Sequence, residues 1–87
     1  MIIDLGFSHP VAELVLYDVA VSSSTALLLV ETSDDMTNWS TQASLMPKPY
    51  QTQALTGSAR YVRLRLSDPM AQFGGGGNGE VAVYAPF

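Results

Sequence analysis

Three arginines gather in one short stretch of an otherwise acidic chain. Arg60, Arg63 and Arg65 lie within Ala59–Leu66, "ARYVRLRL", in a sequence with four basic residues and a net charge of -4. Such a cluster is typical either of an anion-binding patch or of the outer face of a strand. Phosphate binding depends on a net positive field and on counterion release, which disfavours a nucleic-acid ligand. On the outer face of a strand, Arg63 and Arg65 are expected to face Glu or Asp of neighbouring strands. If they instead bind a partner, an acidic protein surface is the one expected.

Carboxylates and the only histidine give little basis for catalysis or metal binding. The side-chain oxygens of Asp34, Asp35 and Asn38 could act as calcium ligands. A calcium loop also needs a bidentate glutamate after them, which this sequence lacks, so we expect a hairpin turn instead. Ser8 precedes His9 without a second base or a G-x-S-x-G motif. There is no cysteine. The sequence predicts a protein that is not an enzyme and that holds no metal and no cofactor.

The glycine-rich run "GGGGNG" matches G-x-G-x-x-G through Gly74, Gly76 and Gly79. A dinucleotide-binding motif requires a strand before the glycines and a helix after them. Here a strand-like segment, "EVAVY", follows instead, and no lysine accompanies the run. We therefore interpret it as a loop, with Phe73 beside it as a candidate anchor for a partner.

Almost every segment that could position these residues has the composition or alternation of a β-strand. Within Ala59–Leu66, Val62, Leu64 and Leu66 fall on one face, and Tyr61, Arg63 and Arg65 fall on the other. The expected strands are Met1–Leu5, Val11–Val21, Ala26–Ser33, Trp39–Leu45, Tyr50–Leu55, Ala59–Leu66 and Glu80–Tyr84. Short strands separated by Gly, Pro, Asn and Ser turns predict an all-β fold, a small antiparallel β-sandwich.

Bulk composition predicts one domain, residues 1–87, that lies against something else. With 87 residues, no cysteine and only 14% charged residues, the chain has few means of stabilising a small fold other than a tight core or partner subunits. The longest apolar run, Ala26–Val30, is too short for a membrane span. The segment "MIIDLG" lacks the features of a signal peptide, so we expect synthesis in a cytoplasm.

Four segments follow one another along the chain: Asp4-Leu5-Gly6, the hairpin-like Glu31–Trp39, Ala59–Leu66 and Glu80–Tyr84. In this order they resemble the discoidin family, the coagulation factor 5/8 type C domains. The resemblance implies a galactose-binding-like jelly roll in which Trp39 packs the core beside the turn. The family pattern begins before its Asp-Leu-Gly strand, so we expect a compact sandwich that lacks the N-terminal segment and has short ligand loops.

Two functions follow as expectations. The first is a structural subunit of a larger assembly or homo-oligomer, such as a small decoration, cement or accessory protein of a virion. Its partner contacts would come from Arg63, Arg65, Phe73 and Tyr50. A truncated sandwich would also leave strand edges unpaired, which favours pairing with another chain. The second, implied by the resemblance, is a carbohydrate-binding module for glycans. Its candidate contacts are Tyr50, Gln51, Gln53, Phe73 and Asn78.

Overall fold

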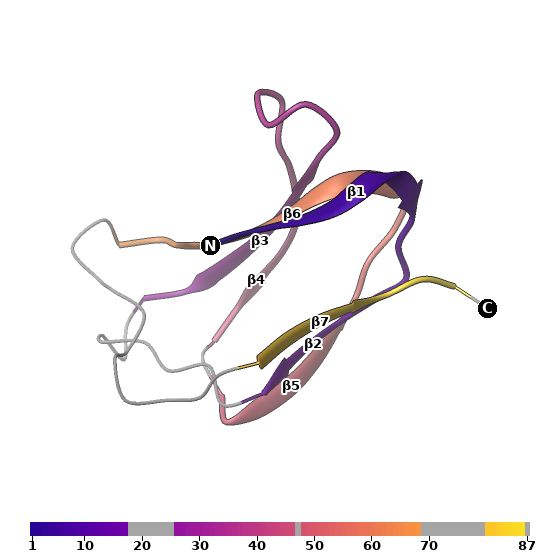
Figure 1. The fold of residues 1–87 in the computed structure, drawn as a ribbon. Helices are drawn as coiled ribbons and strands as arrows, with labels where there is room; N and C mark the ends of the chain where they lie inside the picture. The colour runs from indigo at the N-terminus through magenta and orange to yellow at the C-terminus, as the bar shows by residue number, and fades with distance from the viewer. Residues whose placement is uncertain (18–25, 47, 69–79, 87) are drawn as a thin grey trace.

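The chain folds into seven strands that form two antiparallel sheets (Figure 1). This is a computed structural model, and it describes residues 1–17, 26–46, 48–68 and 80–86. The strands are β1 Ile2–Pro10, β2 Glu13–Tyr17, β3 Leu28–Ser33, β4 Ser40–Leu45, β5 Tyr50–Ala54, β6 Ser58–Leu66 and β7 Glu80–Tyr84. The four-stranded sheet has the order β1-β6-β3-β4, and the three-stranded sheet has the order β5-β2-β7. The predicted all-β sandwich is confirmed.

The core lies between the two sheets, where the alternation of each strand places its apolar side chains. Leu14 and Leu16 of β2 are buried against Val30 of β3 and Val62 and Leu64 of β6. Half-buried side chains complete the core from the neighbouring strands: Ile3, Leu5, Ala43, Leu45, Leu66, Val81 and Val83. Figure 1 shows the two sheets as separate layers, with the β3–β4 hairpin projecting beyond the four-stranded one.

The first strand differs from the sequence-based expectation. The expected strand Met1–Leu5 ends before Gly6, whereas β1 runs on to Pro10. The irregularity is instead a bulge: Asp4 pairs with Tyr61 and His9 pairs with Ala59, so β1 uses five residue steps where β6 uses two. Gly6 lies in the bulge at a φ of 92°, a conformation that glycine adopts at low cost. The glycine therefore bends the strand without ending it.

The strand that carries the arginines has the predicted facing. Val62 and Leu64 are buried, and Leu66 packs against the core. Tyr61, Arg63 and Arg65 lie on the outer face of the four-stranded sheet, because β6 pairs in register with β3 along that whole stretch. The described residues include no helix that could cross a membrane.

Candidate functional site

Glu31 of β3 lies directly between Arg63 and Arg65 on the outer face of the four-stranded sheet. In the β3–β6 register Glu31 pairs with Arg63, and Leu29 pairs with Arg65. Arg63 Nε donates to Glu31 Oε1 at 3.0 Å, and Arg65 Nε donates to the same oxygen at 3.1 Å. Arg65 Nη2 also donates to Oε2 at 3.4 Å. The cross-strand carboxylate expected opposite the arginines is thus supplied by this chain.

The three charges of this cluster differ in their exposure. The side chain of Glu31 is 6% exposed, that of Arg63 is 25% exposed and that of Arg65 is 54% exposed. Burial by itself raises the pKa of Glu31, but the hydrogen bonds and charges of the two arginines outweigh it and hold the pKa below its usual value. Two cations against one anion leave a local charge of about +1, which is located mainly at the exposed Arg65.

Trp39 packs on the same face rather than in the core. The Arg63 guanidinium carbon lies 4.0 Å from the centroid of the Trp39 ring, which is within the range of a cation–π interaction. Trp39 is half-buried, and its indole Nε1 donates to the carbonyl of Met36 at 3.2 Å. The expectation that Trp39 packs the core was therefore wrong. Its ring instead lies against the guanidinium group of Arg63, and the same group donates a hydrogen bond to Glu31.

The β3–β4 hairpin turn is held by Asp35. The backbone N–H groups of Thr37 and Asn38 each donate to Oδ1 of Asp35 at 2.8 Å. The side chain of Asn38 donates to Oδ2 at 2.8 Å, and Ser33 donates to Oδ1 at 3.0 Å. The backbone and side-chain donors of Asn38 and Thr37 lower the pKa of Asp35 strongly. Both carboxylate oxygens serve the turn, as expected of a hairpin.

The remaining arginine and the histidine belong to the β1–β6 pair. Arg60 forms a two-point ion pair with Asp4, with Nε 3.0 Å from Oδ1 and Nη2 3.2 Å from Oδ2. The hydrogen bond from Arg60 lowers the pKa of Asp4. His9 lies on β1, with Nδ1 3.1 Å from the carbonyl oxygen of Pro10 and its ring 5.2 Å from that of Phe7. Within the described residues, no three His, Cys, Asp or Glu side chains come together in a metal-binding group.

A second surface is formed by the outer face of the three-stranded sheet. Tyr17, Tyr50 and Tyr84 are each more than half exposed there. The β2–β5 register sets Tyr17 opposite Tyr50, and their rings meet edge to face with centroids 6.2 Å apart. Glu80 pairs with Tyr17 across β7, and Glu13 pairs with Tyr84. We call this surface the tyrosine face; it comprises Glu13, Val15, Tyr17, Tyr50, Thr52, Ala54, Glu80, Ala82 and Tyr84.

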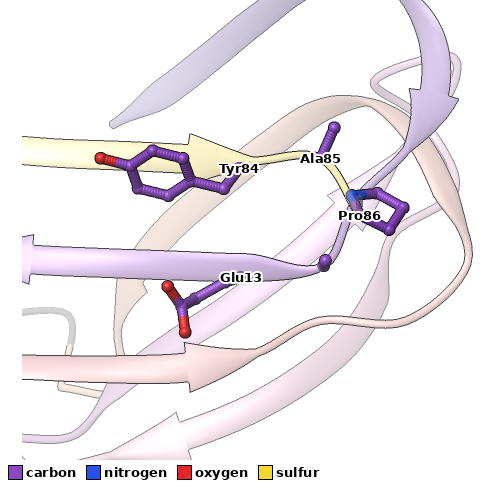
Figure 2. Close-up of a pocket in the computed structure, with 5 residues that line it drawn as sticks. Glu13, Tyr84, Ala85 and Pro86 are labelled. Atoms are coloured by element: carbon purple, nitrogen blue, oxygen red, sulfur yellow. The ribbon is translucent and has the colours of Figure 1, made fainter.

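An open hollow of about 500 Å³ lies at one end of the tyrosine face. It is lined by Ala12, Glu13, Tyr84, Ala85 and Pro86. Figure 2 shows Glu13 and Tyr84 projecting from the neighbouring strands β2 and β7, with Pro86 beyond the end of β7. A carboxylate and a phenol thus stand beside small apolar side chains, which suits a mixed polar and apolar contact.

The residues predicted for glycan contact do not all share this surface. Tyr50 lies on the tyrosine face, whereas Gln51 and Gln53 alternate to the opposite side of β5 and are half-buried. Gln51 Nε2 donates to the carbonyl of Met46 at 2.9 Å, and Gln53 Nε2 donates to that of Ala54 at 3.0 Å. Phe73 and Asn78 lie outside the described residues.

Sequence reasoning missed two members of the tyrosine face, Tyr17 and Tyr84. Both positions follow from the alternation of side chains along a strand. In β2, for example, Leu14 and Leu16 point inward, so Tyr17 points outward. The alternation of each strand was therefore visible in the sequence. The pairing that places Tyr17 beside Tyr50 could not be seen, because it joins segments that are not a hairpin.

The comparisons with protein-family models, with curated proteins and with solved structures found no match to this chain. The class that the fold defines is a small antiparallel β-sandwich.

Proposed function

We propose that this chain is a non-enzymatic interaction subunit of a larger assembly. The observation that carries the proposal is the tyrosine face, where three tyrosines more than half exposed cover the outer side of a sheet. Aromatic residues are enriched in protein interfaces because they provide a large contact area with few side-chain rotamers to immobilise.

The assembly that fits best is a virus particle or a comparably large complex, in which the chain acts as a small decoration, cement or accessory protein. A single domain with 14% charged residues and no cysteine has few other means of stabilisation than a neighbouring subunit. A cytoplasmic origin belongs to the same proposal. The partner contacts proposed from the sequence, Tyr50, Arg63 and Arg65, lie on the outer faces of the two sheets.

A discoidin-like ancestry is part of this proposal. The segments that resemble that family lie on β1, on the β3–β4 hairpin, on β6 and on β7. Three of them are neighbours in one sheet, with the order β1-β6-β3-β4.

Two measurements test the proposed function. Light scattering after size-exclusion chromatography gives the mass of the free chain, which is 9.3 kDa as a monomer. Mass spectrometry of purified particles from the producing cells then detects the chain in a complex at fixed stoichiometry. We expect concentration-dependent association and a fixed copy number per particle. A chain that remains monomeric at every concentration and that joins no particle would contradict the proposal.

A glycan-binding module is the second candidate, because Tyr17 and Tyr50 form a continuous exposed aromatic surface with their rings 6.2 Å apart. Aromatic side chains with a polar tip suit ligands that are apolar on one side and hydroxylated on the other. A glycan array probed with the purified chain tests this candidate. Binding that is lost in Tyr50→Ala, and also in Phe73→Ala, would support it over the assembly function.

A further inference from the structure

The tyrosine face has an unusual combination of charge and hydrogen-bonding groups. Glu13 and Glu80 are exposed, and neither makes an ion pair with another described residue. No lysine or arginine is among the residues of this face. The two glutamates therefore give this face a charge of -2, and each of them pairs with a tyrosine of the neighbouring strand. Guanidinium groups stack on aromatic rings and bind carboxylates, so an arginine-bearing surface complements it.

Such a surface exists on the other side of the same molecule. The outer face of the four-stranded sheet is what we call the arginine face. It is formed by Ile2, Asp4, Leu29, Glu31, Ser33, Trp39, Thr41, Ser44, Tyr61, Arg63 and Arg65. Its net charge is about +1, since Glu31 neutralises one of its two arginines and Asp4 is neutralised by Arg60. Arg65 uses two of its five N–H donors on Glu31, which leaves three that Glu31 does not occupy on a side chain that is 54% exposed.

We propose that the tyrosine face of one copy packs on the arginine face of the next copy. Arg65 of one copy lies among Tyr17, Tyr50 and the carboxylate of Glu80 of its neighbour, while Glu13, at the other end of that face beside Tyr84, adds to the negative charge of the face. This inference rests on the proposed assembly function and names the partner as a second copy of the chain. The occupant follows from charge, because like faces would oppose two negative or two positive surfaces, whereas unlike faces attract.

The geometry has a consequence for the size of the assembly. The two faces lie on opposite layers of the sandwich, as Figure 1 shows, so each copy retains one free face after it has bound one neighbour. A contact between two different surfaces is heterologous, and it produces a ring or an open chain rather than a closed dimer.

The strength of one contact is limited by its area. Three strands spaced about 4.8 Å apart, with five residues each at about 3.4 Å, form a face of roughly 10–15 Å by 17 Å. This is far below the ~800 Å² per partner of a standard stable interface. We therefore expect growth that rises with protein concentration and falls with salt, because the charges involved are exposed and are screened at high ionic strength.

Sedimentation velocity of the full chain over a range of concentrations, at low and at high salt, measures this growth. We expect the weight-average mass to rise well above 9.3 kDa at low salt and to fall towards it at high salt. Arg65→Glu, and separately Glu13→Lys combined with Glu80→Lys, should each return the mass to that of one chain. A 1:1 mixture of the two variants should restore growth, because each altered face then meets an unlike face.

Matched controls separate this contact from net charge and from folding. Glu80→Lys alone should reduce growth, whereas Asp34→Lys on the exposed hairpin, which changes the net charge by the same amount, should leave growth intact. Arg65→Gln removes the charge of Arg65 without placing a carboxylate beside Glu31, and it should reduce growth. Its control is Lys48→Gln, in the link between β4 and β5, which removes one positive charge and should leave growth intact. Unchanged melting temperatures establish that the variants are folded.

The outcomes distinguish this inference from the function on which it rests. Growth or particle incorporation that none of the face variants alters would overturn the inference and leave the assembly function standing. A closed dimer as the final species would also overturn it. A chain that is monomeric throughout and is absent from particles would overturn both.

Discussion

Replacing Glu31 by alanine is expected to destabilise the sandwich far more than replacing Arg65, the more exposed of the two arginines that bind it. The side chain of Glu31 is 6% exposed and accepts three hydrogen bonds from Arg63 and Arg65. Its removal leaves Arg63, of which one quarter is exposed, beside Trp39 without a counter-charge. An unpaired charge in a partly buried place is costly, because the desolvation remains after the attraction is lost.

The magnitude follows from the exposure of each partner. A buried charged pair that loses one member costs roughly 3–5 kcal/mol, whereas an exposed pair contributes at most about 1 kcal/mol. Since the side chain of Arg65 is 54% exposed, its ion pair with Glu31 contributes to the free energy of unfolding as a surface pair does. We therefore expect Glu31→Ala to lower the free energy of unfolding by about 3 kcal/mol and Arg65→Ala to lower it by less than about 1 kcal/mol. A domain of this size has roughly 4–13 kcal/mol in total.

Urea unfolding followed by the fluorescence of the only tryptophan, Trp39, measures both changes. Circular dichroism gives an independent thermal midpoint, which should fall by about 12–24 °C for a loss of 3 kcal/mol. Glu31→Gln is the matched control: it keeps the size and one acceptor, so its loss should lie between those of the other two variants. If Glu31→Ala and Arg65→Ala were equally and weakly destabilising, the carboxylate would not be a buried partner and the reasoning would be refuted.

Three further predictions concern the core, the hairpin turn and acid. Leu14→Ala should lower the free energy of unfolding by about 2–5 kcal/mol, measured in urea, since Leu14 is fully buried between the sheets; a loss below 1 kcal/mol would place it outside the core. Asp35→Ala should speed hydrogen exchange of the Thr37 and Asn38 amides, which donate to its carboxylate, while amides of β6 stay protected. Since the pKa of Glu31 is lowered by folding, its contribution to stability is complete above its usual value near 4.5 and is lost as the pH falls through the folded value; acid titration of Glu31→Gln should therefore show a shallower loss of stability than the parent protein.

Local pattern was sufficient for the strands. The alternation in Ala59–Leu66 assigned Val62 and Leu64 to the interior because successive side chains of a strand point to opposite faces. The ends of the strands and their bulges could not be predicted from this pattern. Gly6 was expected to end a strand, but it occupies a bulge within β1, since the pairing with β6 continues on both sides of it. Trp39 was expected in the core, and its cation–π contact places it on the outer face.

The sequence by itself determined that this protein is an all-β sandwich and which residues of Ala59–Leu66 face inward, because that information is contained in a period of two along the chain. Only the tertiary structure decided that Glu31 lies between Arg63 and Arg65, and that Tyr17, Tyr50 and Tyr84 share one face. These groups join strands that are distant in sequence, β3 with β6 and β2 with β5 and β7. Strand order and register depend on how whole sheets pack, and no local pattern in the chain specifies them.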